Sequence, residues 1–126
     1  MNIEQARFNM IQQQIRPWNV LDDRILALME QVKRENFCPP EHRDLAFMDL
    51  ELPIGHGQVM LAPRVQARLV HDLQLQPTDK VLQIGSGTGY MTALLARLSQ
   101  QVQAFETRAE LVRQAADNLR QAGIAN

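Results

Sequence analysis

The residues best suited to chemistry form a glycine-rich turn with one acidic residue further along the chain. The turn consists of Gly85, Ser86, Gly87, Thr88 and Gly89. Alternating glycines let the backbone turn sharply and let a ligand approach it closely. Glu106 follows 21 positions after Gly85. An acidic residue at this sequence spacing can accept hydrogen bonds from both hydroxyls of an adenosine ribose. The pattern predicts a site for an adenosine-containing cofactor.

The spacing of the glycines separates the classes of adenosine cofactor. Dinucleotide-binding folds use G-x-G-x-x-G, whereas the third glycine comes one residue earlier in this chain. The spacing G-x-G-x-G is typical of S-adenosylmethionine-dependent methyltransferases, whose cofactor has no pyrophosphate. Two alternatives stay open at this point: a nicotinamide or flavin site, which the spacing disfavours, and a turn that only joins a strand to a helix.

Strands and helices in alternation must position this turn. The patterns predict a strand at 80–84, a helix at 90–98, a strand at 101–105 and a helix at 108–122. Short strands alternating with helices are typical of a parallel sheet. The run at 80–84 is apolar and bounded by turns, which predicts a buried strand.

The residues before this unit are predicted to be mostly helical. Apolar periodicity and punctuating residues predict helices over about 3–15, from Asp22 to about 33, and from Pro63 to just before Pro77. The segment 34–57 is predicted to be irregular. The side chains expected to face inward from the first and third helices are Phe8, Ile11, Ile15, Val65, Leu69, Val70 and Leu73.

Length and composition limit the function classes. The 126 residues suit one domain, and a net charge of −1 argues against a protein that works by neutralising nucleic-acid phosphates. No apolar run is long enough to cross a membrane, and the amino terminus does not resemble a secretory signal. A single cysteine, Cys38, excludes an internal disulfide and a cysteine-cluster metal site, and no metal site is predicted. We therefore expect a cytoplasmic protein.

Five segments in chain order resemble the protein-L-isoaspartate O-methyltransferase family. They lie at 7–16, 23–26, 34–39, 52–58 and 81–96, and the run Leu-Pro-Ile-Gly-x-Gly-Gln at 52–58 is the most specific of them. The resemblance implies S-adenosylmethionine as the cofactor and an isoaspartyl protein or peptide as the partner. The implied reaction methylates the L-isoaspartyl carboxyl group, so that the damaged backbone is repaired through a succinimide.

The chain departs from the family pattern on the acceptor side. After Gln58 the family typically continues Thr-Ile-Ser, with the serine hydroxyl at the acceptor carboxylate, and this chain has Val59, Met60 and Leu61 instead. Apolar side chains cannot donate hydrogen bonds to a carboxylate, so no catalytic residue is assigned. Gln58, Val59, Leu61 and His56 are predicted to line the acceptor side. Gln83 stands where the family usually has glutamate, which predicts weaker cofactor binding.

The resemblance implies an α/β fold in which N-terminal helices precede the first half of a Rossmann-like methyltransferase fold. We expect residues 1–76 to form the helical section with the acceptor-side loop, and 77–126 a partial cofactor-binding unit. The family's sheet has more strands, so we expect the chain to be part of a longer protein, or to pair with a second copy through open sheet edges. The alternative function is a non-catalytic binding or interaction domain that retains the methyltransferase fold.

Overall fold

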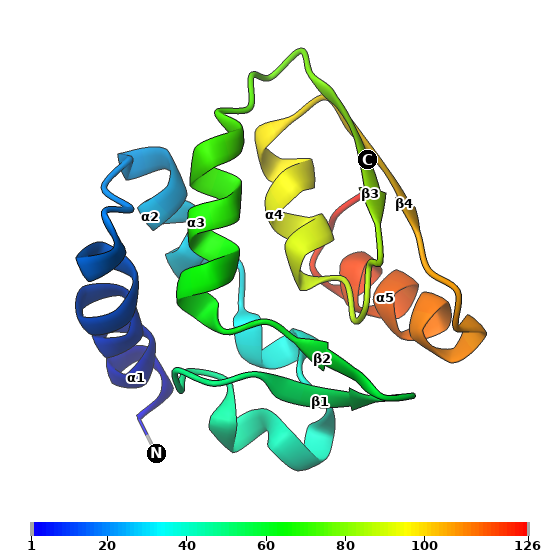
Figure 1. Cartoon of the computed structure of the whole chain (residues 1–126), viewed down its shortest axis with the longest axis horizontal. Coiled ribbons are helices and arrows are strands. Elements are labelled where there is room, and N and C mark those ends of the chain that lie inside the picture. The colour runs from blue at the N-terminus through cyan, green and yellow to red at the C-terminus, as the bar shows by residue number, and fades with distance from the viewer. Residues whose placement is uncertain (1, 126) are drawn as a thin grey trace.

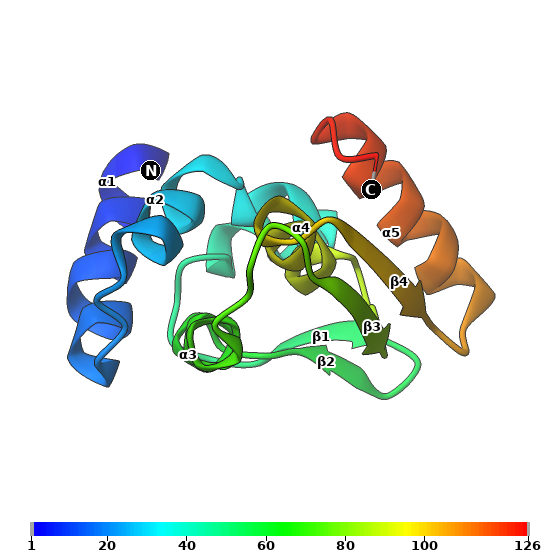
Figure 2. The ribbon, with the colours of Figure 1, turned by 90° about the horizontal axis from the view of Figure 1, so that it is seen from above.

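A computed structural model describes residues 2–125. In chain order its elements are α1 (Ile3–Met10), a π-helical turn (Ile11–Ile15), a 3₁₀ turn (Arg16–Trp18), α2 (Asp23–Gln31), two further 3₁₀ segments (Arg34–Phe37 and Pro40–Leu45), β1 (Leu52–Gly55), β2 (Gln58–Met60), α3 (Pro63–Leu73), β3 (Lys80–Ile84), α4 (Tyr90–Leu98), β4 (Gln101–Phe105) and α5 (Ala109–Gln121). Helices α1 and α2 lie at one end of the molecule, with β4 and α5 at the other (Figures 1 and 2). Helices α3 and α4 lie between them and contact each other.

The first helix buries a different face from the one predicted. Ile11 and Ile15 are buried as expected, but Phe8 is 53% exposed and Arg7 is buried in its place. The Arg7 guanidinium donates two hydrogen bonds to the Glu35 carboxylate, at 2.9 and 2.8 Å. It also stacks on the Phe47 ring, 5.1 Å from the ring centre. Because Arg7 has these partners, its charged side chain can be buried on the face of α1 that packs inward, and Phe8 lies on an exposed face.

A β-hairpin interrupts the segment that was predicted to be irregular. Strands β1 and β2 pair antiparallel, with Leu52 opposite Met60. Leu52 and Ile54 are buried while the residues between and after them are exposed, which is the alternation of a strand with one covered face. The turn passes through residues 55–57, all three with positive φ. The glycine-flanked tip of the hairpin points away from α3 (Figure 1).

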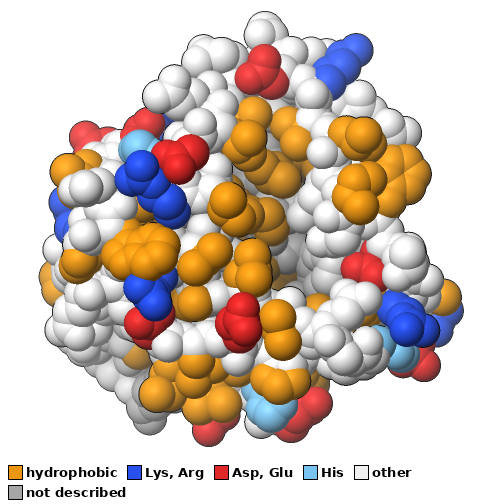
Figure 3. All heavy atoms as spheres, in the orientation of Figure 1, with side chains coloured by type: hydrophobic (Ala, Val, Ile, Leu, Met, Phe, Trp, Pro, Cys, Tyr) orange, Lys and Arg blue, Asp and Glu red, His pale blue; other side chains and the backbone are white. Residues whose placement is uncertain are grey.

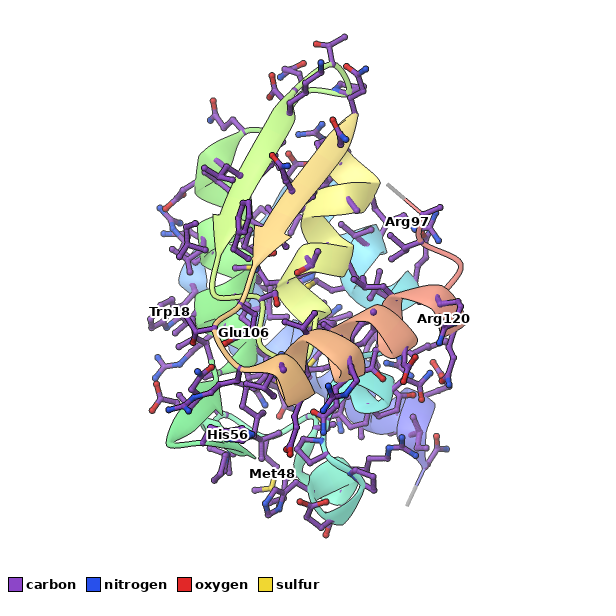
Figure 4. All side chains as sticks on the ribbon, turned by 90° about the vertical axis from the view of Figure 1, so that its right-hand side faces the viewer. Trp18, Met48, His56, Arg97, Glu106 and Arg120 are labelled. Carbon is purple, nitrogen blue, oxygen red and sulfur yellow. The ribbon has the colours of Figure 1, made fainter. Side chains whose placement is uncertain are left out.

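Strands β3 and β4 pair in parallel, from Lys80 opposite Gln101 to Ile84 opposite Phe105, as predicted. The prediction that β3 is buried is wrong, because Leu82 and Ile84 are 63% and 75% exposed. Helix α4 packs behind the two strands (Figure 4). Among the described residues nothing comparable covers the other face, so the apolar side chains on that face stay in solvent.

The third helix begins at Pro63 and ends before Pro77, as predicted. Val70 is buried, but Leu69 and Leu73 are 47% and 54% exposed, so the prediction that both face inward is wrong. Both side chains instead line an open cleft between α3 and β3. The apolar stripe of α3 is wide enough to serve the core and the wall of this cleft together.

Candidate functional site

The cleft beside α3 joins the two groups of residues that the sequence singled out. It has a volume of about 440 Å³. Its lining comes from the hairpin, α3, β3, the glycine turn and α4: Ile54, Val59, Met60, Leu61, Gln66, Leu69, Leu73, Val81, Leu82, Gln83, Ile84, Gly85, Ser86, Gly87, Thr88, Tyr90, Met91 and Leu95. Figure 3 shows hydrophobic side chains along this hollow. The glycine turn and residues of the hairpin thus line one apolar space.

The glycine turn needs glycine for space as well as for backbone conformation. Gly87 has φ +54°, and a Cβ there would lie 3.2 Å from Cδ1 of Ile54 in the hairpin. Gly89 has φ +96° and directly precedes α4, where a Cβ would lie 3.2 Å from the Cβ of Ala115. Contacts this short force neighbouring atoms to move. The turn is therefore packed tightly between the hairpin and α5.

Glu106 lies directly after β4 and holds the glycine turn. Its Oε1 accepts a hydrogen bond from the Gly87 backbone N–H at 3.0 Å. Its Oε2 accepts from the backbone N–H groups of Thr107 at 2.9 Å and Arg108 at 3.2 Å. Desolvation raises the pKa of Glu106, but these hydrogen bonds outweigh it and hold the pKa below its usual range. The carboxylate is charged at neutral pH and lies against the glycine turn.

Gln83 lies on β3 and lines the cleft. Its Oε1 accepts a hydrogen bond from the Thr92 hydroxyl in the first turn of α4, at 2.5 Å. The contact fixes the amide near the glycine turn. A neutral amide offers no charge to a ligand's ammonium group, as the sequence indicated.

The residues predicted for the acceptor side divide into two groups. Val59 and Leu61 line the cleft. Gln58 does not line it, and its Nε2 donates instead to Oε2 of Glu106 at 3.3 Å. His56 sits at the hairpin tip with φ +57°, and its Nε2 lies 3.3 Å from Oε2 of Glu110 on α5. Both polar side chains thus contact the segment from the end of β4 into α5, while the apolar pair faces the cleft.

Sequence reasoning assigned no role to a buried cation beside this cleft. Arg34 is 1% exposed and donates to the carbonyl oxygens of Ala46 at 2.7 Å and Leu61 at 2.9 Å. It also donates to the Gln66 side-chain oxygen and lies 5.1 Å from the centre of the Tyr90 ring. Burial lowers the pKa of Arg34, although a guanidinium stays protonated in proteins. The resemblance at 34–39 was the only signal for this residue.

The side chains that line the cleft are uncharged at neutral pH. The only ionisable group among those described is the Tyr90 hydroxyl, whose pKa burial raises to about 12. Cys38 is buried nearby, and burial raises its pKa too. Among residues 2–125 no three His, Cys, Asp or Glu side chains are grouped to hold a metal ion, and no helix is long and apolar enough to cross a membrane. The cleft suits a transfer that needs alignment of reactants more than proton exchange.

Comparison with known sequences gives one consistent result. A family model described as Protein-L-isoaspartate(D-aspartate) O-methyltransferase matches residues 5–126. Protein-L-isoaspartate O-methyltransferase 1 of Rhodopseudomonas palustris is 43% identical over 120 residues, which are 95% of this chain and 49% of the relative. The protein-L-isoaspartate O-methyltransferase of Aeropyrum pernix is 43% identical over 122 residues, covering 94% and 47%. The chain thus spans about half the length of the curated relatives it matches.

Solved structures give the same fold. A Plasmodium falciparum structure assigned to the protein-L-isoaspartate O-methyltransferases, in complex with S-adenosyl-L-homocysteine, matches with a TM-score of 0.72 and 24% identity over 97% of this chain and 56% of that one. A second structure described as a protein-L-isoaspartate O-methyltransferase matches with a TM-score of 0.75 and 22% identity, covering 98% and 39%. These likenesses confirm the predicted fold class, N-terminal helices followed by part of a Rossmann-like fold.

Proposed function

The chain belongs to the protein-L-isoaspartate O-methyltransferase family, and we propose that it binds S-adenosylmethionine for methyl transfer to L-isoaspartyl carboxyl groups. The family match confirms the resemblance seen in the sequence. The observation that carries the proposal is the shared cleft, which places the glycine turn beside the hairpin of the acceptor side. Methyl transfer requires that donor and acceptor meet in one such space.

The residues around the glycine turn fit the cofactor. The positive φ of Gly87 and the nearby Ile54 methyl group both disfavour a side chain at this position. We assign Gly85, Ser86, Gly87, Thr88 and Gly89 to the cofactor loop. The charged carboxylate of Glu106 would accept the ribose hydroxyls. When bound, the cofactor supplies a methyl group activated on sulfur, and this chain's residues orient it and exclude water.

The acceptor side fits an isoaspartyl carboxylate less well. Val59 and Leu61 line the cleft without offering a hydrogen-bond donor. Arg34 is a buried cation that does not line the cleft but donates to the carbonyl of Leu61, which does. We propose that this buried charge attracts an anionic acceptor, but that the loss of the hydroxyl lowers turnover.

Calorimetry tests the cofactor assignment. We expect S-adenosylhomocysteine to bind and NAD not to bind. Glu106→Ala should weaken S-adenosylhomocysteine binding about tenfold or more, because it removes the acceptor of two hydrogen bonds to a charged group. Equal binding by the wild type and Glu106→Ala would place the ribose elsewhere.

A labelled-methyl assay tests the acceptor. An isoaspartyl peptide should accept the methyl group slowly, and the matched aspartyl peptide should not accept it. Leu61→Ser should raise the rate about tenfold, since it restores a hydroxyl whose hydrogen bond to a charged carboxylate contributes about 1.5 kcal/mol. A rate that is already high in the wild type would show that the hydroxyl is unnecessary.

The apolar lining at Val59 and Leu61 supports a second candidate, a non-catalytic domain that binds the cofactor or a partner. This candidate predicts binding of S-adenosylhomocysteine with no methyl transfer in either the wild type or Leu61→Ser. We also keep two proposals from the sequence: a cytoplasmic location, and pairing with a second copy through the β3–β4 sheet.

A further inference from the structure

Three contacts hold the hairpin against the cofactor-binding unit. Gln58 donates to Glu106, and His56 lies 3.3 Å from the Glu110 carboxylate. Ile54 packs against the glycine turn at Gly87. Figure 4 shows Glu106 and His56 on the same side of the molecule, where the end of β4 meets the hairpin. The contact between Gln58 and Glu106, 48 positions apart, thus connects the hairpin directly to the proposed ribose-binding group.

The Glu106 carboxylate has more donors than it can keep when a ribose binds. Oε2 has four donors within hydrogen-bonding distance: the Thr107 N–H at 2.9 Å, the Arg108 N–H at 3.2 Å, the Gln58 amide at 3.3 Å and the Thr107 hydroxyl at 3.4 Å. A carboxylate oxygen offers about two lone pairs. The backbone donors are fixed by the turn after β4. Oε1 accepts from the Gly87 N–H and has a lone pair left for one ribose hydroxyl. A second ribose hydroxyl, at Oε2, would displace a side-chain donor, and of the two side-chain donors there Gln58 is the one from another element.

We propose that Gln58 is a positioning residue that competes with the cofactor ribose for Glu106. In the free protein it ties the hairpin to Glu106, and ribose binding releases it. The hairpin carries Val59 and Leu61 into the cleft, so this release adjusts the acceptor side only after the cofactor is bound. The order of binding is then cofactor first and acceptor second. This inference rests on the proposed function, because it needs Glu106 to bind the ribose.

The test compares Gln58→Leu with the wild type and with Gln76→Leu, a matched change in an exposed loop. Titration with S-adenosylhomocysteine should give binding about three- to tenfold tighter for Gln58→Leu, since one competing hydrogen bond is gone. Gln76→Leu should bind as the wild type does. A variant that merely damaged the fold would not bind more tightly.

Hydrogen exchange over 52–60 supplies the second readout. In the wild type, S-adenosylhomocysteine should speed exchange in the hairpin, whereas in Gln58→Leu exchange should be fast without ligand and unchanged by it. Equal or weaker binding by Gln58→Leu would overturn the competition while leaving the cofactor site intact. Absence of S-adenosylhomocysteine binding in both proteins would overturn the cofactor assignment and the competition together.

Discussion

The N-terminal section and the outer face of the β3–β4 sheet differ in how completely their side chains are covered. Arg7 and Arg34 are charged, yet only 2% and 1% exposed, whereas Leu82 and Ile84 are apolar, yet 63% and 75% exposed. Arg7 has carboxylate and aromatic partners, and Arg34 has carbonyl and aromatic partners. At these four positions burial follows the supply of partners and covering elements more closely than side-chain polarity.

The contrast separates stability from binding. The N-terminal section buries Arg7 and Arg34 through contacts with residues distant in sequence, and removing such contacts is costly. The β3–β4 sheet borders the cleft and has the exposed apolar face. Substitutions there should change binding or association more than folding. Substitutions in the N-terminal section should thus change mainly the free energy of unfolding, and those on the exposed sheet face mainly binding or association.

The largest difference should come from shortening one leucine on each side. Leu94 on α4 is 0% exposed, so Leu94→Ala should lower the free energy of unfolding by about 3–4 kcal/mol through lost burial and a cavity. Leu82→Ala should lower it by less than about 0.5 kcal/mol, because most of that side chain is already in solvent. Urea unfolding followed by circular dichroism measures both. Equal losses would mean that the outer face of β3 is covered in solution.

Removing the buried cation should have the next largest effect. Arg34→Leu should lower the free energy of unfolding by about 3 kcal/mol, because the Ala46 and Leu61 carbonyls lose their donor. Arg113→Leu, at an exposed position on α5, is the control and should change it by less than about 0.5 kcal/mol. If both variants unfold alike, Arg34 does not stabilise this section.

The ion pair of Arg7 with Glu35 should give a smaller, pH-dependent effect. Glu35→Gln should lower the free energy of unfolding by about 2 kcal/mol at neutral pH, since Arg7 stays buried without its main carboxylate. Desolvation raises the pKa of Glu35, but hydrogen bonds from Arg7 outweigh it and hold the pKa below the ordinary value of 4.5. The stabilisation is therefore complete above pH 4.5 and lost as the pH falls through the folded-state pKa. Urea unfolding across this range should show the wild type and the variant converging in acid, and a constant difference would contradict the assignment.

Elements that depend on local signals were predictable from the sequence. Helix α4 spans Tyr90–Leu98 and β4 spans Gln101–Phe105 as predicted, and Asp22 caps α2 by accepting a hydrogen bond from the Arg24 N–H at 2.8 Å. Caps, prolines and short apolar runs act over a few residues, so the pattern alone contains them. The hairpin was missed although the alternation at 52–54 and the glycine-flanked tip both indicated it.

Features that depend on distant partners were not predictable. Arg7 is buried because Glu35, 28 positions away, is there to pair with it. The contact of Gln58 with Glu106 needs both the hairpin and the end of β4 in place. The exposure of β3 depends on what else covers the sheet, and its apolar pattern alone gave the opposite expectation. For the same reason the glycine turn was found from the sequence while its connection to the hairpin was not.

The smallest effect should appear in association through the open face. Leu82, Ile84 and Phe105 lie on one face of the sheet and are more than half exposed, and a second copy could cover them or pair with the free edge of β3. Leu82→Lys should weaken self-association about tenfold, because it places a charge in that contact. Sedimentation over a range of concentrations measures this, with Val112→Lys on the exposed side of α5 as the control. A wild type that stays monomeric and unfolds cooperatively would show that no second copy is needed, and the exposed face would then be available to another polypeptide.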